Sequence, residues 1–316
     1  MAENTEGPQA GQKVALVTGA GVGGIGGALA VELHSAGYFV ICAVRRPSSA
    51  SELLRPGIVA IELDVSSTES VSAAAKKVSS LTNDKLHVLV NNAGSATHRP
   101  ALDLDVDGVV ASMFDVNVLG VMRMVKAFAD LLINAKGCVV NIGSIAPIVP
   151  LVYSSAYNAT KAALHAYGDA LRMELKPLGY CAPLQFFFLL FPQTTSLTGC
   201  ESRVDVVTVV TGGVKSNLGE SFLREDSPSL PEGSRYLPVQ NFWLHRVTMS
   251  QKGAMDTDEY ARKIVGMIQK KSRPIWFWSG GSVSIAWFMY YFVPLRLRLF
   301  VMARRFGLIG KKLLGQ

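Results

Sequence analysis

The chain has 316 residues, of which 49% are hydrophobic and 17% are charged, and its formal net charge is +7. The length suits one large domain or two small ones, and the apolar share suits a large buried core or some lipid-facing surface. The sequence shows no aromatic and basic motif for nucleic acid bases, and its four cysteines lack metal-ligand spacing, so we expect neither a nucleic acid partner nor a metal site.

The first half of the chain alternates short apolar runs with helical patterns. Residues 1–12 are polar and acidic, which predicts a disordered leader and not a signal peptide. Further along, cysteines 42 and 138 lie in apolar runs, where buried free thiols are expected. The predicted strands are 13–18, 38–44, 58–63, 86–90, 138–142 and a further one that begins at 204, and the predicted helices are 29–36, 70–81 and 107–132.

This alternation predicts an α/β fold. Continuous apolar strands separated by helices are typical of a parallel sheet that is covered on both faces. We therefore expect a single Rossmann-type, doubly wound parallel sheet over residues 13–273, followed by an apolar and basic C-terminal extension at 274–316. Such sheets bind ligands at the carboxyl ends of their strands.

The first strand ends in a glycine-rich turn, T-G-A-G-V-G-G-I-G, at 18–26. Glycines between a strand and a helix let a pyrophosphate approach the backbone, and the helix N-terminus favours its negative charge. The turn therefore predicts a nucleotide site, and a tight structural turn is the alternative.

The second and third strands end in charged residues. A carboxylate after the second strand would favour NAD, but Arg45 and Arg46 stand there, and arginine suits the 2′-phosphate of NADP. The alternative is a solvated basic turn. Asp64 closes the third strand, where it is placed either to meet an adenine edge or to cap the next helix.

Tyr157 and Lys161 lie four residues apart in Y-N-A-T-K, with Ser144 thirteen residues upstream of Tyr157. On a helix these two side chains share one face, so the phenol and the ammonium can point into the same space. A nearby cation favours the phenolate and lowers the pKa of a tyrosine, which is ordinarily near 10. The pair is therefore suited to proton transfer with a substrate oxygen.

Taken together, these motifs resemble those of the short-chain dehydrogenase/reductase family. The residues that carry the resemblance are Thr18, Gly19, Gly24, Gly26, Asn91, Asn92, Ala93, Gly94, Asn117, Ser144, Tyr157 and Lys161. The match covers about 13–178 and resumes near 204. The family has a single Rossmann-type domain with a seven-stranded parallel sheet, and it transfers hydride between a nicotinamide cofactor and a carbonyl or alcohol.

The resemblance implies a role for each matching residue. Tyr157 would donate a proton to the carbonyl oxygen, Ser144 would hydrogen-bond that oxygen, and Lys161 would lower the pKa of Tyr157 and hold the nicotinamide ribose. Asn117 would hold a water that links Lys161 to solvent. The implied contacts to NADP(H) are Thr18, Gly19, Gly24, Ile25, Gly26, Arg45, Arg46, Asp64, Asn91, Gly94, Tyr157, Lys161, Val214 and Ser216.

Two motifs depart from the commonest family pattern. The glycine turn has one extra residue between Gly19 and Gly24, which puts the roles of Gly21 and Gly23 in doubt. Gly212-Gly213 replaces the usual Pro-Gly, and Ser216 stands where a threonine is common.

A narrower resemblance concerns the substrate. The longer glycine turn, T-G-G-V-K-S-N, and the C-terminal tail look like those of the fungal NADPH-dependent 1-acyldihydroxyacetone-phosphate reductases. That group implies reduction of a lipid ketone at the cytosolic face of the endoplasmic reticulum or of lipid droplets. The alternatives are a cytoplasmic ketoreductase of a polyketide-like ketone in fungal secondary metabolism, and a membrane-associated NADP-binding protein without catalysis. A homo-oligomer is possible in each case.

Residues 180–203 do not fit a Rossmann domain. They separate the Tyr157 helix, which we expect to end by 177–179, from the next strand, and they contain an apolar run at 186–191. The family usually has a short turn here. We interpret the segment as a translated retained intron, because its 24 codons preserve the reading frame, and a membrane-touching loop is the alternative.

The C-terminal third contains two further candidate regions. Residues 218–250 are rich in Pro, Ser and charge and follow the sixth strand, where the family keeps a substrate lid; Tyr236, Phe242 and Trp243 either line an acyl channel there or pack the lid. In the C-terminal extension, an apolar core at 284–293 is too short for a membrane span. Aromatics followed by arginines suit a membrane interface, and a helix pair that covers the substrate is the alternative.

Overall fold

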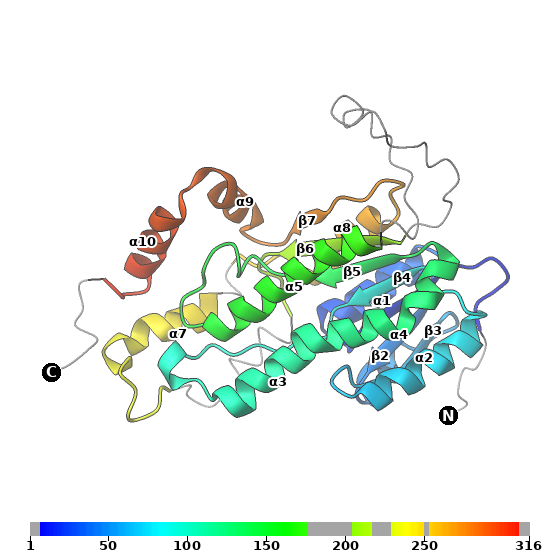
Figure 1. Ribbon diagram of the computed structural model, residues 1–316, viewed down its shortest axis with the longest axis horizontal. Coiled ribbons are helices and arrows are strands. Elements are labelled where there is room, and N and C mark those ends of the chain that lie inside the picture. The colour runs from blue at the N-terminus through cyan, green and yellow to red at the C-terminus, as the bar shows by residue number, and fades with distance from the viewer. Residues whose placement is uncertain (1–6, 176–203, 217–228, 250–252, 310–316) are drawn as a thin grey trace, which may run out of the picture.

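A computed structural model describes residues 7–175, 204–216, 229–249 and 253–309. Its centre is a parallel sheet of seven strands in the order β3-β2-β1-β4-β5-β6-β7 (Figure 1). The chain runs outward from β1 to β3, then crosses back to β4 and runs outward to the other edge. The order therefore reverses between β1 and β4, where doubly wound sheets bind their ligands. The strands are β1 Val14–Thr18, β2 Phe39–Val44, β3 Ile58–Glu62, β4 Val88–Asn91, β5 Cys138–Ile142, β6 Asp205–Thr211 and β7 Trp276–Ser279.

Helices cover both faces of this sheet. Successive strand residues point to opposite faces, so Ala15 and Val17 belong to one buried cluster while Val14 and Leu16 belong to another. Helices α1 and α8 pack on the first face, and α2, α4 and α5 pack on the second. The helices are α1 Ile25–Ser35, α2 Thr68–Thr82, α3 Ala111–Phe114, α4 Gly120–Ala135, α5 Ser155–Glu174, α7 Gln240–Met249, α8 Thr257–Ile268, α9 Val283–Phe292 and α10 Leu295–Arg305.

The predicted α/β fold is confirmed, with shifts at the element ends. The helix predicted at 29–36 begins four residues earlier, at Ile25, and its first turn contains the buried glycines 26 and 27. The helix predicted at 107–132 is a continuous helical segment from 106 to 135 that contains two π-helical turns, η3 (Val106–Val110) and η4 (Asp115–Leu119). Such π turns occur often at functional sites, and η4 carries Asn117.

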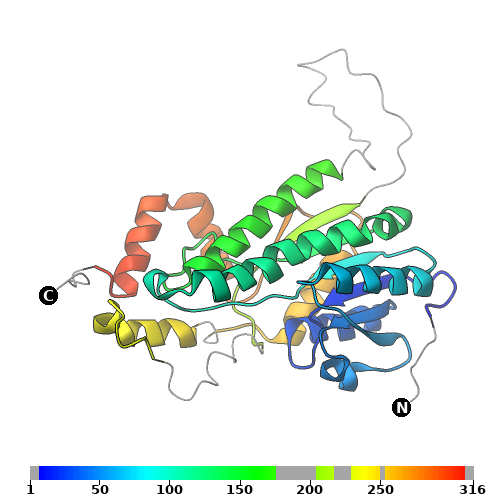
Figure 2. The same ribbon diagram turned by 60° about the horizontal axis from the view of Figure 1, so that its bottom comes forward.

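The boundary predicted between the domain and the C-terminal extension is wrong. Strand β7 pairs in parallel with β6 and completes the sheet, so the Rossmann-type domain extends to Ser279 at least. The extension begins after it, and α9 and α10 share a third buried cluster with α7. Figure 2 shows these three helices gathered at one end of the molecule. Within the described residues, no helix is both long enough and apolar enough to cross a membrane.

The prediction of a disordered leader over residues 1–12 is wrong for residues 7–12. Residues 7–12 contain a turn, and Gln12 donates a side-chain hydrogen bond to the carbonyl oxygen of Gly37 at 3.2 Å. Residues 1–6 of the leader lie outside the described part of the chain, as do residues 180–203 with Cys181 and Cys200. The other two cysteines, Cys42 and Cys138, are buried thiols that form no disulfide with each other, as predicted.

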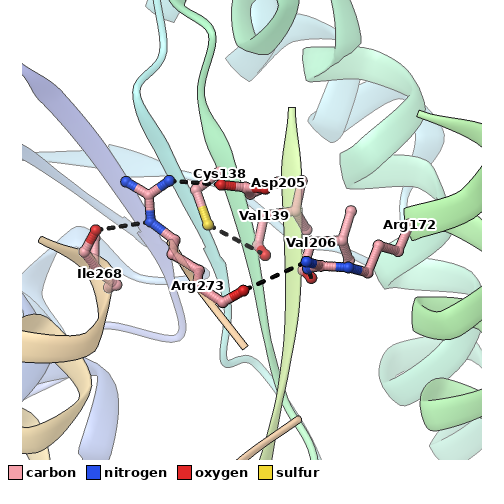
Figure 3. A network of polar contacts seen from close by, with 7 residues as sticks. All are labelled: Cys138, Val139, Arg172, Asp205, Val206, Ile268 and Arg273. Atoms are coloured by element: carbon pink, nitrogen blue, oxygen red, sulfur yellow. Dashed lines mark hydrogen bonds and ion pairs between the residues drawn. The ribbon is translucent and has the colours of Figure 1, made fainter. Parts of the chain in front are cut away.

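A polar network fixes the start of β6 (Figure 3). Asp205 and Arg273 form an ion pair at 2.8 Å, and Arg273 Nε donates to the carbonyl oxygen of Ile268 at 2.8 Å. From the other side, Arg172 near the end of α5 donates to the carbonyl oxygens of Val206 and Arg273. The network therefore ties α5, β6 and the segment between α8 and β7 together at the N-terminal edge of the sheet.

Candidate active site

A cavity with a volume of about 620 Å³ lies at the carboxyl ends of the strands. Its lining includes the glycine turn after β1, the loop after β4 and the segment after β6. Apolar residues after β5 and residues of α7, α9 and α10 line it as well. Ser144, Tyr157 and Lys161 line the cavity too, so three of the four predicted catalytic side chains lie in the same space as the glycine turn, and Asn117 does not line it.

The glycine turn forms a surface poor in side chains. Gly19 has a positive φ of 66°, a conformation in which a side chain is strained, and it lines the cavity with Gly21, Gly24 and Ile25. Gly26 does not line the cavity; a methyl group there would collide with the Gly19 carbonyl oxygen. Gly26 was predicted to contact the cofactor, but in the structure its lack of a side chain lets α1 begin close to the backbone of the glycine turn. This arrangement fits a pyrophosphate at the start of a helix.

Thr18 and Asn91 support the strand ends from below. The Thr18 hydroxyl donates to the Val90 carbonyl oxygen at 3.2 Å and accepts from the backbone N–H groups of Asn92 and Ala93 at 3.0 Å. Asn91 Nδ2 donates to Asn141 Oδ1 at 2.9 Å. Both predicted cofactor contacts are buried and do not line the cavity, so their contribution is to hold the ends of β1, β4 and β5 in place.

Gly94, Val214 and Ser216 do line the cavity, as expected of residues that border a cofactor. A Cβ added to Gly94 would lie 3.2 Å from Asn117 Oδ1 and 4.0 Å from Lys161 Nζ. The missing side chain therefore keeps the approach to Lys161 open.

Lys161 is held beside Tyr157 by the strand below it. Its Nζ donates to the carbonyl oxygen of Ile142, at the end of β5, at 2.8 Å, and lies 5.8 Å from the ring centroid of Tyr157. Ser144 lies close enough to Tyr157 to lower its pKa through hydrogen bonding. The predicted spacing of four residues therefore places phenol, ammonium and hydroxyl around one point.

Burial changes the acidity of both groups. It raises the pKa of Tyr157, and the Ser144 hydrogen bond and the charge of Arg246 partly oppose that rise. Burial also lowers the pKa of Lys161 to about 8. A phenol with a raised pKa is protonated at neutral pH, which is the form that donates a proton to a carbonyl oxygen. The cation that acts on Tyr157 in this structure is Arg246, and the lowering of the Tyr157 pKa by Lys161 stays a prediction.

Asn117 braces the floor of the site. Its Nδ2 donates to the Ser95 carbonyl oxygen at 2.8 Å and to Thr160 Oγ1 at 3.1 Å, and its Oδ1 accepts from the Ser95 N–H at 2.8 Å. The side-chain amide thus links the loop after β4 to α5. A water held by Asn117 stays a prediction.

His165 is a site residue that the sequence reasoning missed. Its Nε2 accepts from the backbone N–H of Ser144 at 3.2 Å, and its ring packs edge-on against Trp276. Burial, helped by the charge of Lys161, lowers the pKa of His165 to about 4, so the ring is neutral and its lone pair is free to accept. The available signal was spacing, since His165 follows Lys161 by four residues on the same helix face.

Arg45, Arg46 and Asp64 lie at the ends of β2 and β3 and do not line the cavity. Both arginines are exposed. The Asp64 carboxylate accepts from the Ser66 hydroxyl and N–H, and this lowers its pKa. The reading of Asp64 as a helix cap is wrong, because Ser67 caps α2.

The three aromatics of the predicted lid pack it and do not line the cavity. Trp243 is buried and donates through Nε1 to the His98 carbonyl oxygen at 2.6 Å, Tyr236 packs edge-on against Tyr153, and Phe242 joins the same cluster. The acyl-channel reading of these residues is therefore wrong. The apolar wall of the cavity consists instead of Ile145, Val149, Leu151, Ile285, Ala286, Met289 and Met302.

The arrangement can bind a ketone between a dinucleotide and an apolar wall. The glycine turn, Gly94, Val214 and Ser216 would hold a nicotinamide cofactor, which supplies hydride when bound. Ser144 and Tyr157 are placed to hydrogen-bond a carbonyl oxygen, and Tyr157 can donate the proton that the oxygen needs. Among the described residues, no three His, Cys, Asp or Glu side chains form a group that could hold a metal ion.

Comparison with known proteins gives a consistent result. A family model described as short chain dehydrogenase matches residues 13–180. The chain is 40% identical over 283 residues to the short-chain dehydrogenase srdE of Neurospora crassa, with 89% of this chain and 88% of that protein covered. It is 34% identical over 280 residues to the NADPH-dependent 1-acyldihydroxyacetone phosphate reductase of Schizosaccharomyces pombe, with 85% and 86% covered. The crystal structure of a short-chain dehydrogenase from Streptomyces avermitilis superposes with a TM-score of 0.71 at 24% identity, over 95% of this chain and 99% of that one.

Proposed function

The chain belongs to the short-chain dehydrogenase family and is an oxidoreductase, and on that premise we propose that it uses NADPH to reduce a ketone on a lipid-like substrate to a secondary alcohol. The observation that carries the proposal is the single cavity in which Ser144, Tyr157 and Lys161 meet both the glycine turn and an apolar wall. In the proposed reaction the carbonyl carbon receives hydride, and the carbonyl oxygen receives the proton of Tyr157.

The choice of NADPH over NADH is supported by charge at the end of β2. Arg45 and Arg46 follow that strand and are exposed, where a guanidinium can meet a 2′-phosphate. A relative that is 34% identical carries NADPH in its name.

The lipid-like substrate is supported by the cavity wall and by that same relative. The seven apolar side chains of the wall described above line the same cavity as Tyr157, and they suit an acyl chain. The relative's name gives 1-acyldihydroxyacetone phosphate as its substrate, which is a ketone with an acyl chain. The same wall suits a polyketide-like ketone, which is the second substrate class to test.

The proposal includes contact with a membrane or lipid droplet at the cytosolic face. Helices α9 and α10 expose a run of large apolar side chains, among them Phe288, Phe292 and Phe300, beside exposed arginines. Aromatics with neighbouring cations suit an anionic membrane interface. A variant that lacks residues 282–316 should lose flotation with vesicles of phosphatidylcholine and phosphatidylserine, and flotation equal to that of the whole chain would contradict membrane contact through these helices.

One screen tests the reaction itself. NADPH oxidation is followed at 340 nm with purified protein, with 1-octanoyl dihydroxyacetone phosphate in one arm and an aromatic polyketide ketone in the other, and Tyr157→Phe is the matched inactive control. Turnover of the acyl dihydroxyacetone phosphate supports a lipid-like substrate. Turnover of the polyketide ketone alone would instead assign the substrate to the polyketide-like class. Tight NADPH binding without turnover of any ketone would support a cofactor-binding protein that is not an enzyme.

A further inference from the structure

Arg246 is a buried arginine in the wall of the active-site cavity. It lies on α7, its residue exposure is 2%, and it lines the cavity together with Ser144 and Tyr157. The sequence reasoning did not single it out, and the reaction proposed above gives it no part beyond its effect on the pKa of Tyr157. An arginine is seldom fully buried unless it is paired.

No carboxylate neutralises this guanidinium in the described part of the chain. Arg246 takes part in none of the ion pairs found there, and its Nη2 donates to Ser154 Oγ at a long 3.3 Å. Its Nε is buried without a hydrogen-bond partner. A buried charge left without a partner is costly, so the arginine has a donor and a charge available for a bound group.

The surroundings of Arg246 add positive potential. Among the described residues that line the cavity there is no Asp or Glu, whereas Lys161, Arg246 and Arg305 all line it. Ser154 stands before the first residue of α5, and its hydroxyl makes no capping bond to that helix. It meets Arg246 and His98 Nδ1 instead, so the positive end of the α5 dipole lies close to the guanidinium.

We propose that Arg246 is the binding residue for an anionic group, a phosphate or a carboxylate, on the ketone substrate. This inference rests on the proposed reductase function and narrows its substrate class. Ser154 is three residues from Tyr157 at the start of the same helix, and Arg246 and Tyr157 line the same cavity, so one substrate can place its anionic group at Arg246 and its carbonyl at Tyr157. The apolar wall then takes the remainder of the substrate.

The test uses pairs of ketones in which one member carries an anionic group and the other is neutral. One pair is 1-octanoyl dihydroxyacetone phosphate and 1-octanoyl dihydroxyacetone, and the other is 3-oxodecanoate and its methyl ester. The purified whole protein is compared with Arg246→Met and Arg246→Lys, and Arg262→Met removes an exposed arginine of α8 as the matched control. A hydrogen-bonded charge is worth about a 10- to 150-fold change in binding, so Arg246→Met should lose about that much in kcat/KM for an anionic ketone.

For the neutral partner of that pair, the loss should stay below about threefold, and Arg246→Lys should recover part of the anionic rate because it keeps the charge. The phosphate pair and the carboxylate pair show which anion is preferred. Equal losses of kcat/KM on charged and neutral ketones, together with a shift of the alkaline limb of the pH–rate profile to higher pH, would overturn the proposal. The guanidinium would then act by lowering the pKa of Tyr157. A weaker NADPH affinity in Arg246→Met would overturn it as well, because the arginine would then bind the cofactor.

A second measurement separates this inference from the reductase function. Calorimetry with NADP⁺ present compares 1-octanoyl glycerol 3-phosphate with 1-octanoyl glycerol. Tighter binding of the phosphate by the wild type, lost in Arg246→Met and kept in Arg262→Met, supports the anion site even if neither ketone is reduced. Equal binding of the two compounds by the wild type contradicts the anion site whether or not ketones are reduced.

Discussion

Replacing Lys161 by methionine tests the energetics of the site through its dependence on pH. Burial lowers the pKa of Lys161 from 10.5 to about 8. Each pH unit of that difference is worth about 1.4 kcal/mol, so the folded protein bears a penalty of about 3 kcal/mol for holding the charged lysine. Lys161 is 6% exposed, and little of that penalty is screened by solvent.

The sign follows from proton binding. Between pH 8 and 10.5 the unfolded chain keeps the lysine proton and the folded chain releases it, so the folded state becomes more stable as the pH rises. Below pH 8 the penalty is present in full. In Lys161→Met this contribution is absent, so the stability of the wild type relative to the variant should rise by about 3 kcal/mol between pH 7.5 and 10.5.

Urea unfolding at pH 7.5, 9 and 10.5 measures this difference. Lys126→Met on α4 removes an exposed lysine and serves as the control for general effects of charge. The lost hydrogen bond to Ile142 shifts the variant curve by a nearly constant amount, so the slope with pH is the diagnostic quantity. Wild-type and Lys161→Met curves that run parallel with pH would refute the reasoning.

Three further predictions concern chemistry, cofactor and fold. Tyr157→Phe should lower kcat by at least about 1,000-fold and leave the NADPH affinity within about twofold, because only the proton donor is lost. Stopped-flow kinetics measure kcat and fluorescence titration measures the NADPH affinity. Turnover near that of the wild type would refute the assigned role. Replacing both Arg45 and Arg46 by alanine should weaken NADPH binding by about 10-fold or more and NADH binding little, because only NADPH carries the 2′-phosphate; equal losses in paired titrations would remove the cofactor argument. Asp205→Ala should destabilise the protein by about 3 kcal/mol in urea, because it leaves the partly buried Arg273 without its partner; a loss under about 1 kcal/mol would show that the ion pair contributes little.

The sequence predicted the sheet and the catalytic trio because both depend on local patterns. Apolar runs of five or six residues gave the strands, and the spacing of four residues between Tyr157 and Lys161 placed both side chains on one helix face. These features survive in almost any tertiary context. Asn117 was placed correctly on its helix, but its contacts to Ser95 and Thr160 depend on how the loop after β4 packs against α5.

The parts that were missed depend on long-range packing. Strand β7 holds the half-buried W-F-W, and two glycines follow it, so its pattern resembled an interfacial segment. It becomes a strand only because β6 lies beside it. Arg246 carries no local signal at all, since its burial arises when α7 closes over the start of α5.

Two parts of the chain line the cavity, and the apolar wall takes Ile145, Val149 and Leu151 from the earlier part and its α9 and α10 residues from the later part. The glycine turn, Ser144, Tyr157 and Lys161 all precede residue 175, whereas α7, α9 and α10 follow residue 229. After gene duplication, substitutions in the later part can therefore change which molecule is accepted while hydride and proton transfer stay intact. Exchanging residues 229–309 between relatives should therefore shift substrate preference, so that new enzymes can arise without passing through inactive ancestors.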